Sequence, residues 1–64
     1  MSRYYVNRRR QKTGEHEVHV DGCPWLPVRK NRIELGEFGT CQQAIEAASA
    51  KFAKVDGCWH CLPE

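Results

Sequence analysis

The stretch Cys58-Trp59-His60-Cys61 places two thiols two residues apart near the end of a 64-residue chain. Two thiolates at this spacing can reach one tetrahedral ion, with each Zn–S distance near ~2.3 Å, while the backbone between them turns beneath the ion. The stretch therefore predicts half of a metal site. Two further ligands must come from elsewhere in the chain.

The best upstream candidates are His19 and Cys23, in the stretch His19-Val20-Asp21-Gly22-Cys23. The Asp-Gly pair lets the chain turn back between the two candidate side chains. Together with Cys58 and Cys61 they make a His-Cys-Cys-Cys set, which is typical of a structural zinc site.

Cys41, the remaining cysteine, competes with His19 for one position of that set. It begins an apolar stripe, where it can simply pack as a small hydrophobic side chain. It also lies in the first turn of an expected helix, where the helix dipole favours a thiolate. His16 and His60 are more typical of solvated or hydrogen-bonded histidines, and we leave them outside the site.

A chain this short has a marginal hydrophobic core, and four cysteines can staple it through a metal or through disulfides. The start, Met1-Ser2-Arg3-Tyr4-Tyr5, lacks the apolar segment of a signal peptide, so we expect a cytoplasmic protein with reduced thiols. If the thiols oxidise, a Cys23–Cys41 disulfide is one alternative. A redox dithiol at Cys58 and Cys61 is another, although no helix can follow Cys61 to activate it.

The formal net charge is only +2, which by itself indicates no nucleic-acid partner. The cations are nevertheless clustered, which makes nucleic acid a possible partner beside another protein. No apolar run approaches the ~20 residues of a membrane span, and we expect a monomer without a small-molecule substrate. The two basic clusters consist of Arg8, Arg9, Arg10 and Lys12, and of Arg29, Lys30 and Arg32.

Hydrophobic periodicity predicts three short strands. Residues 4–7 are aromatic and β-branched, and residues 16–20 alternate so that His19 faces away from Val18 and Val20. This arrangement leaves the ring of His19 available to a ligand at the strand's end. Residues 22–27 form a proline-containing loop from which Trp25 is expected to cap the core. Residues 33–38 alternate again, and a bulge at Gly36 would turn Phe38 inward instead of Glu37.

The clearest element is a helix over residues 41–54, which contain no Gly or Pro and follow a good N-cap residue, Thr40. Its apolar residues recur at helical spacing and predict one face packed on the sheet. Gly57 can end the helix and lead the chain into the Cys-x-x-Cys turn. The residues of the apolar face are Cys41, Ala44, Ile45, Ala48 and Phe52.

The order His19-x3-Cys23-Pro24-Trp25-Leu26, Asn31-Arg32-Ile33, a helix with Ala44, and Cys58-x-x-Cys61 resembles the N-terminal zinc-binding module of Ada-type DNA alkylation-repair regulators. The resemblance spans about two thirds of the chain. It implies that His19, Cys23, Cys58 and Cys61 hold zinc in a hairpin-plus-helix fold that contacts DNA. The methyl acceptor of the Ada-type module corresponds to His19 here, so methyl transfer is not implied. The chain is equally similar to small uncharacterised bacterial Cys/His proteins.

These observations predict a single α+β domain over residues 1–64, with a short antiparallel sheet of two or three strands packed by one C-terminal helix. We expect a structural-zinc binding module rather than an enzyme, because the chain offers little volume for a substrate pocket. The alternatives are a disulfide-stapled or dithiol redox mini-protein, and a protein-interaction module without metal.

Overall fold

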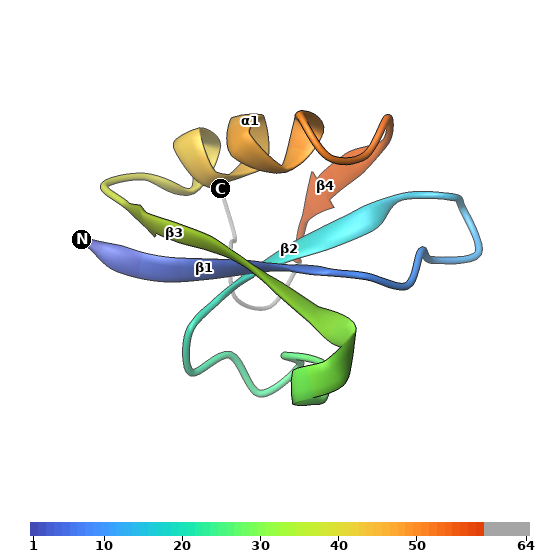
Figure 1. The fold of residues 1–64 in the computed structure, drawn as a ribbon, viewed down its shortest axis with the longest axis horizontal. Coiled ribbons are helices and arrows are strands. Elements are labelled where there is room, and N and C mark those ends of the chain that lie inside the picture. The colour runs from blue at the N-terminus through green and yellow to red at the C-terminus, as the bar shows by residue number, and fades with distance from the viewer. Residues whose placement is uncertain (59–64) are drawn as a thin grey trace.

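The computed structural model describes residues 1–58. Four strands form one sheet in the order β3-β1-β2-β4, and α1 covers one face of it, whereas the loop with the short helix η1 lies on the other side (Figure 1). The predicted α+β class is therefore confirmed, but the sheet is mixed and has four strands instead of two or three. The elements are β1 (Ser2–Asn7), β2 (His16–Val20), η1 (Arg29–Asn31), β3 (Arg32–Phe38), α1 (Cys41–Ser49) and β4 (Val55–Gly57).

The β1–β2 hairpin is antiparallel, with Tyr4 opposite Val20 and Val6 opposite Val18. Residues that are directly opposite share a face of the sheet. Val6 and Val18 are fully buried in the core beneath α1. The hairpin expected from the alternating sequence is thus present.

A bulge shapes β3. Tyr4 pairs with Gly36 and Tyr5 with Glu34, which leaves one extra residue on β3 between them. Gly36 has a φ of +116°, a conformation that side chains with a Cβ rarely adopt. The bulge turns Phe38 onto the core, with its ring centroid 6.2 Å from that of Tyr4, so the bulged interpretation was the correct one.

The helix begins where it was expected, but it ends early. The Thr40 side chain accepts a hydrogen bond from the Gln43 backbone N–H at 3.2 Å, and the Gln43 side chain accepts one from the Thr40 N–H at 3.3 Å, forming a capping box. The helix ends at Ser49 rather than at residue 54. Phe52 leaves the helix to stack on the His16 ring, with 3.7 Å between ring centroids.

The residues after α1 form β4, which the sequence analysis missed by assigning them to the helix and its end. The Lys54 carbonyl accepts a hydrogen bond from the His16 N–H at 2.9 Å, and β4 then pairs in parallel with β2. A second expectation was also wrong: Trp25 does not cap the core, since 60% of it is exposed. Within residues 1–58, no helix is long and apolar enough to cross a membrane.

Candidate metal centre

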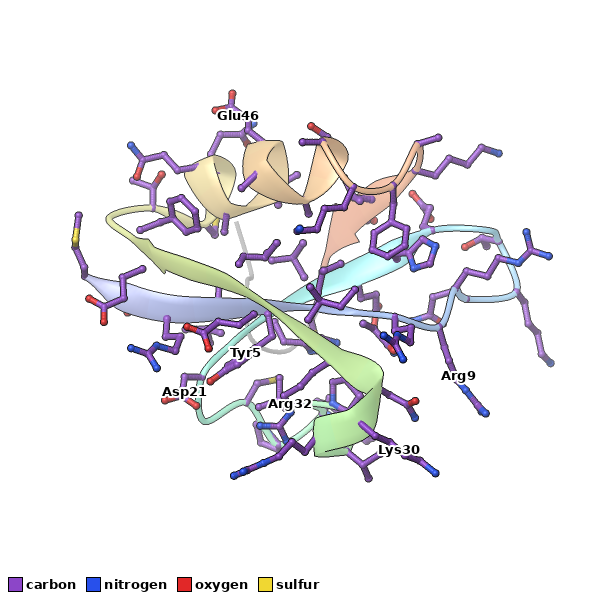
Figure 2. All side chains as sticks on the ribbon, in the orientation of Figure 1. Tyr5, Arg9, Asp21, Lys30, Arg32 and Glu46 are labelled. Carbon is purple, nitrogen blue, oxygen red and sulfur yellow. The ribbon has the colours of Figure 1, made fainter. Side chains whose placement is uncertain are left out.

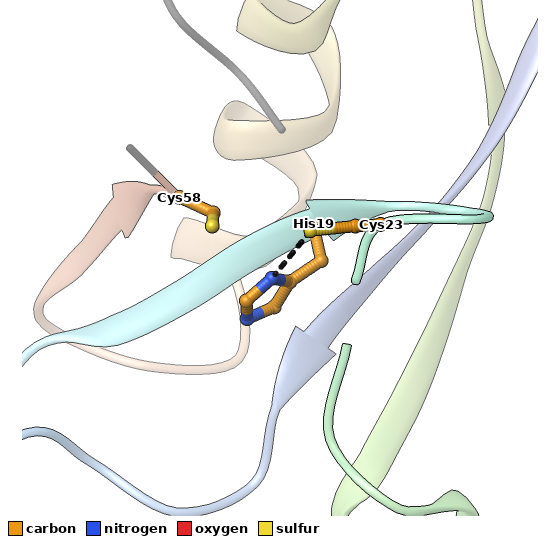
Figure 3. A group of neighbouring side chains, drawn as sticks. All are labelled: His19, Cys23 and Cys58. Atoms are coloured by element: carbon orange, nitrogen blue, oxygen red, sulfur yellow. Dashed lines mark hydrogen bonds between the residues drawn. The ribbon is translucent and has the colours of Figure 1, made fainter. Parts of the chain in front are cut away.

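Three of the four predicted ligands come together. One ligand atom from each of His19, Cys23 and Cys58 lies within 4.8 Å of the others, and all three residues are buried (Figure 3). Cys61, the predicted fourth ligand, lies outside the described residues, as does His60. The structure thus contains a three-residue group with the composition expected for a metal centre.

The sheet register explains how His19 and Cys58 become neighbours. His19 pairs with Tyr5, whereas its neighbour Val18 pairs with Val6, so His19 faces away from α1. Val18 also pairs with Gly57 in the parallel β2–β4 ladder, and the Cys58 N–H donates to the Val18 carbonyl at 2.9 Å. Cys58 therefore follows β4 directly beside the end of β2.

A tight turn after β2 places Cys23 beside His19. The Cys23 N–H donates to the Val20 carbonyl at 3.1 Å, and Gly22 has a φ of +89°. The Trp25 backbone N–H lies 3.4 Å from the Cys23 sulfur and donates to it. This hydrogen bond fixes the position of the Cys23 sulfur within the turn.

The spacing of the ligand atoms fits a tetrahedral ion. The His19 Nδ1 lies 3.7 Å from the Cys23 Sγ, shown as a dashed line in Figure 3. Ligand bonds of zinc to nitrogen and sulfur at tetrahedral angles place two such atoms about 3.6 Å apart. The Nδ1 and the sulfur are therefore already at the separation that a shared zinc ion requires.

His19 is in the chemical state that a metal needs. It is only 1% exposed, and this burial lowers the pKa of its imidazole below the usual value, because the charged form is poorly solvated there. The neutral ring is the form that binds a metal. The sequence analysis placed His19 on the correct face of β2, but it expected an accessible ring and not one covered by the loop that follows β2.

Glu17 is a site residue that the sequence analysis missed. Its Oε1 lies 3.7 Å from the His19 Nε2, on the opposite edge of the ring from Cys23. Carboxylates in this place orient metal-ligating histidines and increase their basicity. The sequence contained a signal for this contact, because Glu17 and His19 are two residues apart on a strand and such residues share a face of the sheet.

The competing candidates lie elsewhere. Cys41 is buried in the core cluster with Ala44 and Ala48 on the inner face of α1, and it does not join the three-residue group. His16 is also outside it: its Nδ1 is hydrogen-bonded to the Asn7 carbonyl at 2.9 Å, as expected for a structural histidine. Among the described residues, the geometry thus selects His19 over Cys41.

The sulfurs allow two chemical states. The structure assigns Cys23 to a disulfide, whereas Cys41 and Cys58 are thiols, so the expected alternative of a Cys23–Cys41 disulfide was wrong. A disulfide sulfur and a metal-ligating thiolate are alternative states of the same side chain, and they are separable by mass.

The predicted nucleic-acid residues are brought together as well, although they lie far apart in the sequence. Asn7 pairs with Arg32, and the Arg8 N–H donates to the Asn31 carbonyl at 2.7 Å. The loop after β1 and the η1 segment therefore meet at one end of the sheet.

Comparisons of the chain with protein-family models, with curated proteins and with solved structures find no match. The resemblance to the Ada-type module stays a prediction.

Proposed function

We propose that the chain is a structural zinc-binding module in which His19, Cys23 and Cys58 hold the ion and Cys61 supplies the fourth ligand. The observation that carries this proposal is the convergence of one imidazole and two sulfurs within 4.8 Å, in a site where all three residues are buried. A buried, closed site is typical of structural rather than catalytic zinc.

The donor set decides the class of metal. Thiolate and imidazole ligands favour zinc and other borderline or soft ions, whereas magnesium and calcium prefer oxygen ligands. A bound ion would connect the turn after β2 to the residue that follows β4. Its role would be to keep the short parallel pair of strands in register.

The alternative is a disulfide-stapled mini-protein, and the assignment of Cys23 to a disulfide supports it. We favour zinc because a disulfide uses two sulfurs and gives no role to the buried His19 or to its distance from the Cys23 sulfur. A protein purified under reducing conditions should therefore carry zinc.

Mass spectrometry of the intact chain distinguishes the states. Under native conditions the reduced protein should carry one zinc ion, and under denaturing conditions its mass should be that of the fully reduced chain. A metal-free chain that is lighter by one or more pairs of hydrogens would instead establish disulfides and contradict the zinc proposal.

Two matched substitutions test the choice of ligands. Cys58→Ser removes a proposed ligand, so zinc should be lost from the native spectrum. Cys41→Ser removes a buried thiol that lies outside the group, so zinc should be retained. Loss of zinc in the Cys41 variant but not in the Cys58 variant would overturn the assignment.

A further inference from the structure

The face of the sheet away from α1 has a feature that the metal centre does not explain. Tyr5, Arg32, Lys30 and Arg9 all lie on this side, whereas Glu46 projects from the helix on the opposite side (Figure 2). The loop after β1 and the η1 segment meet at one end of the sheet, which brings Arg9 to the same side of the sheet as Lys30 and Arg32 (Figure 2). Arg10 instead lines a separate hollow with Phe52 and Lys54. We call the surface that carries Arg9, Arg29, Lys30 and Arg32 the basic face.

The positive charge of the chain is clustered. Seven of the ten Lys and Arg residues belong to the two basic clusters, and four of these form the basic face. Arg3, Lys51 and Lys54 share the rest of the chain with all eight acidic residues, of which Asp21 and Glu34 lie on the same side of the sheet as the basic face (Figure 2). Within residues 1–58, none of the seven clustered cations forms an ion pair, since the ion pairs present involve Arg3 and His19.

A hollow of about 380 Å³ opens on the same face, lined by Arg3, Tyr5, Arg29, Arg32 and Glu34. The Arg32 guanidinium carbon lies 5.4 Å from the centre of the Tyr5 ring, and its Nε donates to the Pro27 carbonyl at 3.0 Å. These contacts hold a planar cation over an aromatic ring at the hollow, an arrangement that can accept both a phosphate and a flat base.

Aromatic and apolar surface lies beside these charges. Trp25 and Val28 are each 60% exposed, and both belong to the loop that leads into Arg29. Aromatic side chains interleaved with cations are typical of surfaces that bind single strands, where bases stack on the rings and phosphates meet the cations. A duplex hides its bases from such stacking.

We propose that the basic face binds a single-stranded nucleic acid, with phosphates on Arg9, Arg29, Lys30 and Arg32 and a base stacked at Trp25. The surface is formed by residues other than the metal ligands. Substitutions in this surface therefore leave the proposed metal ligands intact, and the test uses the full chain as isolated.

The test measures the binding of a fluorescein-labelled oligothymidylate by fluorescence anisotropy in a series of salt concentrations. The logarithm of the affinity should fall with the logarithm of salt concentration with a slope of about −2 to −4, since each neutralised phosphate of a single strand contributes about −0.7. No measurable binding at low salt, or binding that salt does not change, would overturn the proposal.

Three double substitutions remove equal charge from different places. Arg9→Gln with Lys30→Gln, and Arg29→Gln with Lys30→Gln, should each weaken binding about tenfold. The matched control, Lys51→Gln with Lys54→Gln, lies outside the basic face and should weaken it less than about threefold. An equal loss in all three variants would show attraction by net charge alone and would contradict the proposed surface.

The contribution of base stacking is tested at Trp25. Trp25→Ala should weaken oligothymidylate binding about tenfold, whereas Trp25→Phe, which keeps an aromatic ring, should retain most of the affinity. Neither change should affect the binding of heparin, a polyanion without bases. If heparin, anionic vesicles or duplex DNA bind as tightly as the single strand, or if Trp25→Ala has no effect, the basic face is a general polyanion surface and the proposal is wrong.

Discussion

At the scale of single residues, the three side chains that the structure brings together were predictable because thiol and imidazole spacing is visible in the sequence. Strand alternation also placed His19 correctly on the face away from Val18 and Val20. Its burial could not be predicted, because the covering loop after β2 has no regular periodicity. The exposure of Trp25 was missed for the same reason.

Glu17 provides the prediction at this scale. With Nδ1 of His19 on the ion, Nε2 carries the proton, and the nearest Glu17 carboxylate oxygen lies 3.7 Å from it. Glu17→Gln should therefore weaken zinc binding about 10- to 100-fold, the usual effect of losing a carboxylate that supports a metal-ligating histidine. Competition against a chromophoric chelator measures this change.

The matched control is Glu34→Gln, which removes the same charge from an exposed site on β3. It should change the zinc affinity by less than about twofold, because exposed and distant charges are largely screened. Equal losses in the two variants would assign the effect to net charge and not to contact with His19.

At the scale of elements, the helix start was predictable and the helix end was not. The N-cap residue and the absence of Gly and Pro define the start, whereas the end depends on the stacking of Phe52 on His16, a contact between distant parts of the chain. β4 was missed because three residues, Val55–Gly57, are too few to show alternation.

The capping box of α1 gives a prediction at this scale. Thr40→Ala removes the side-chain acceptor of the Gln43 N–H, so it should lower the free energy of unfolding by about 0.5–2 kcal/mol. Urea unfolding of the zinc-loaded protein measures the change. Ser49→Ala, at the exposed end of the same helix, should stay within about 0.5 kcal/mol, and a larger loss there than at Thr40 would contradict the assigned role of the cap.

At the scale of the whole molecule, the core is small. The largest fully buried side chains are His19, Val6 and Val18, and one of these three belongs to the proposed metal centre and not to the apolar core. A chain of this length buries only about 60% of the surface that its unfolded form exposes. The length alone therefore predicts a staple, whereas the parallel β2–β4 pair that the staple would secure was not predictable from the sequence.

The central claim is that an ion held by His19, Cys23 and Cys58 stabilises this fold, and amide NMR spectra of the reduced, metal-stripped chain test it most directly. Adding zinc should sharpen and disperse the spectrum until one equivalent is bound, with the largest shifts at these three residues and at Trp25, whose N–H donates to the Cys23 sulfur. A metal-free spectrum that is already sharp and dispersed, and that zinc leaves unchanged, would contradict the claim.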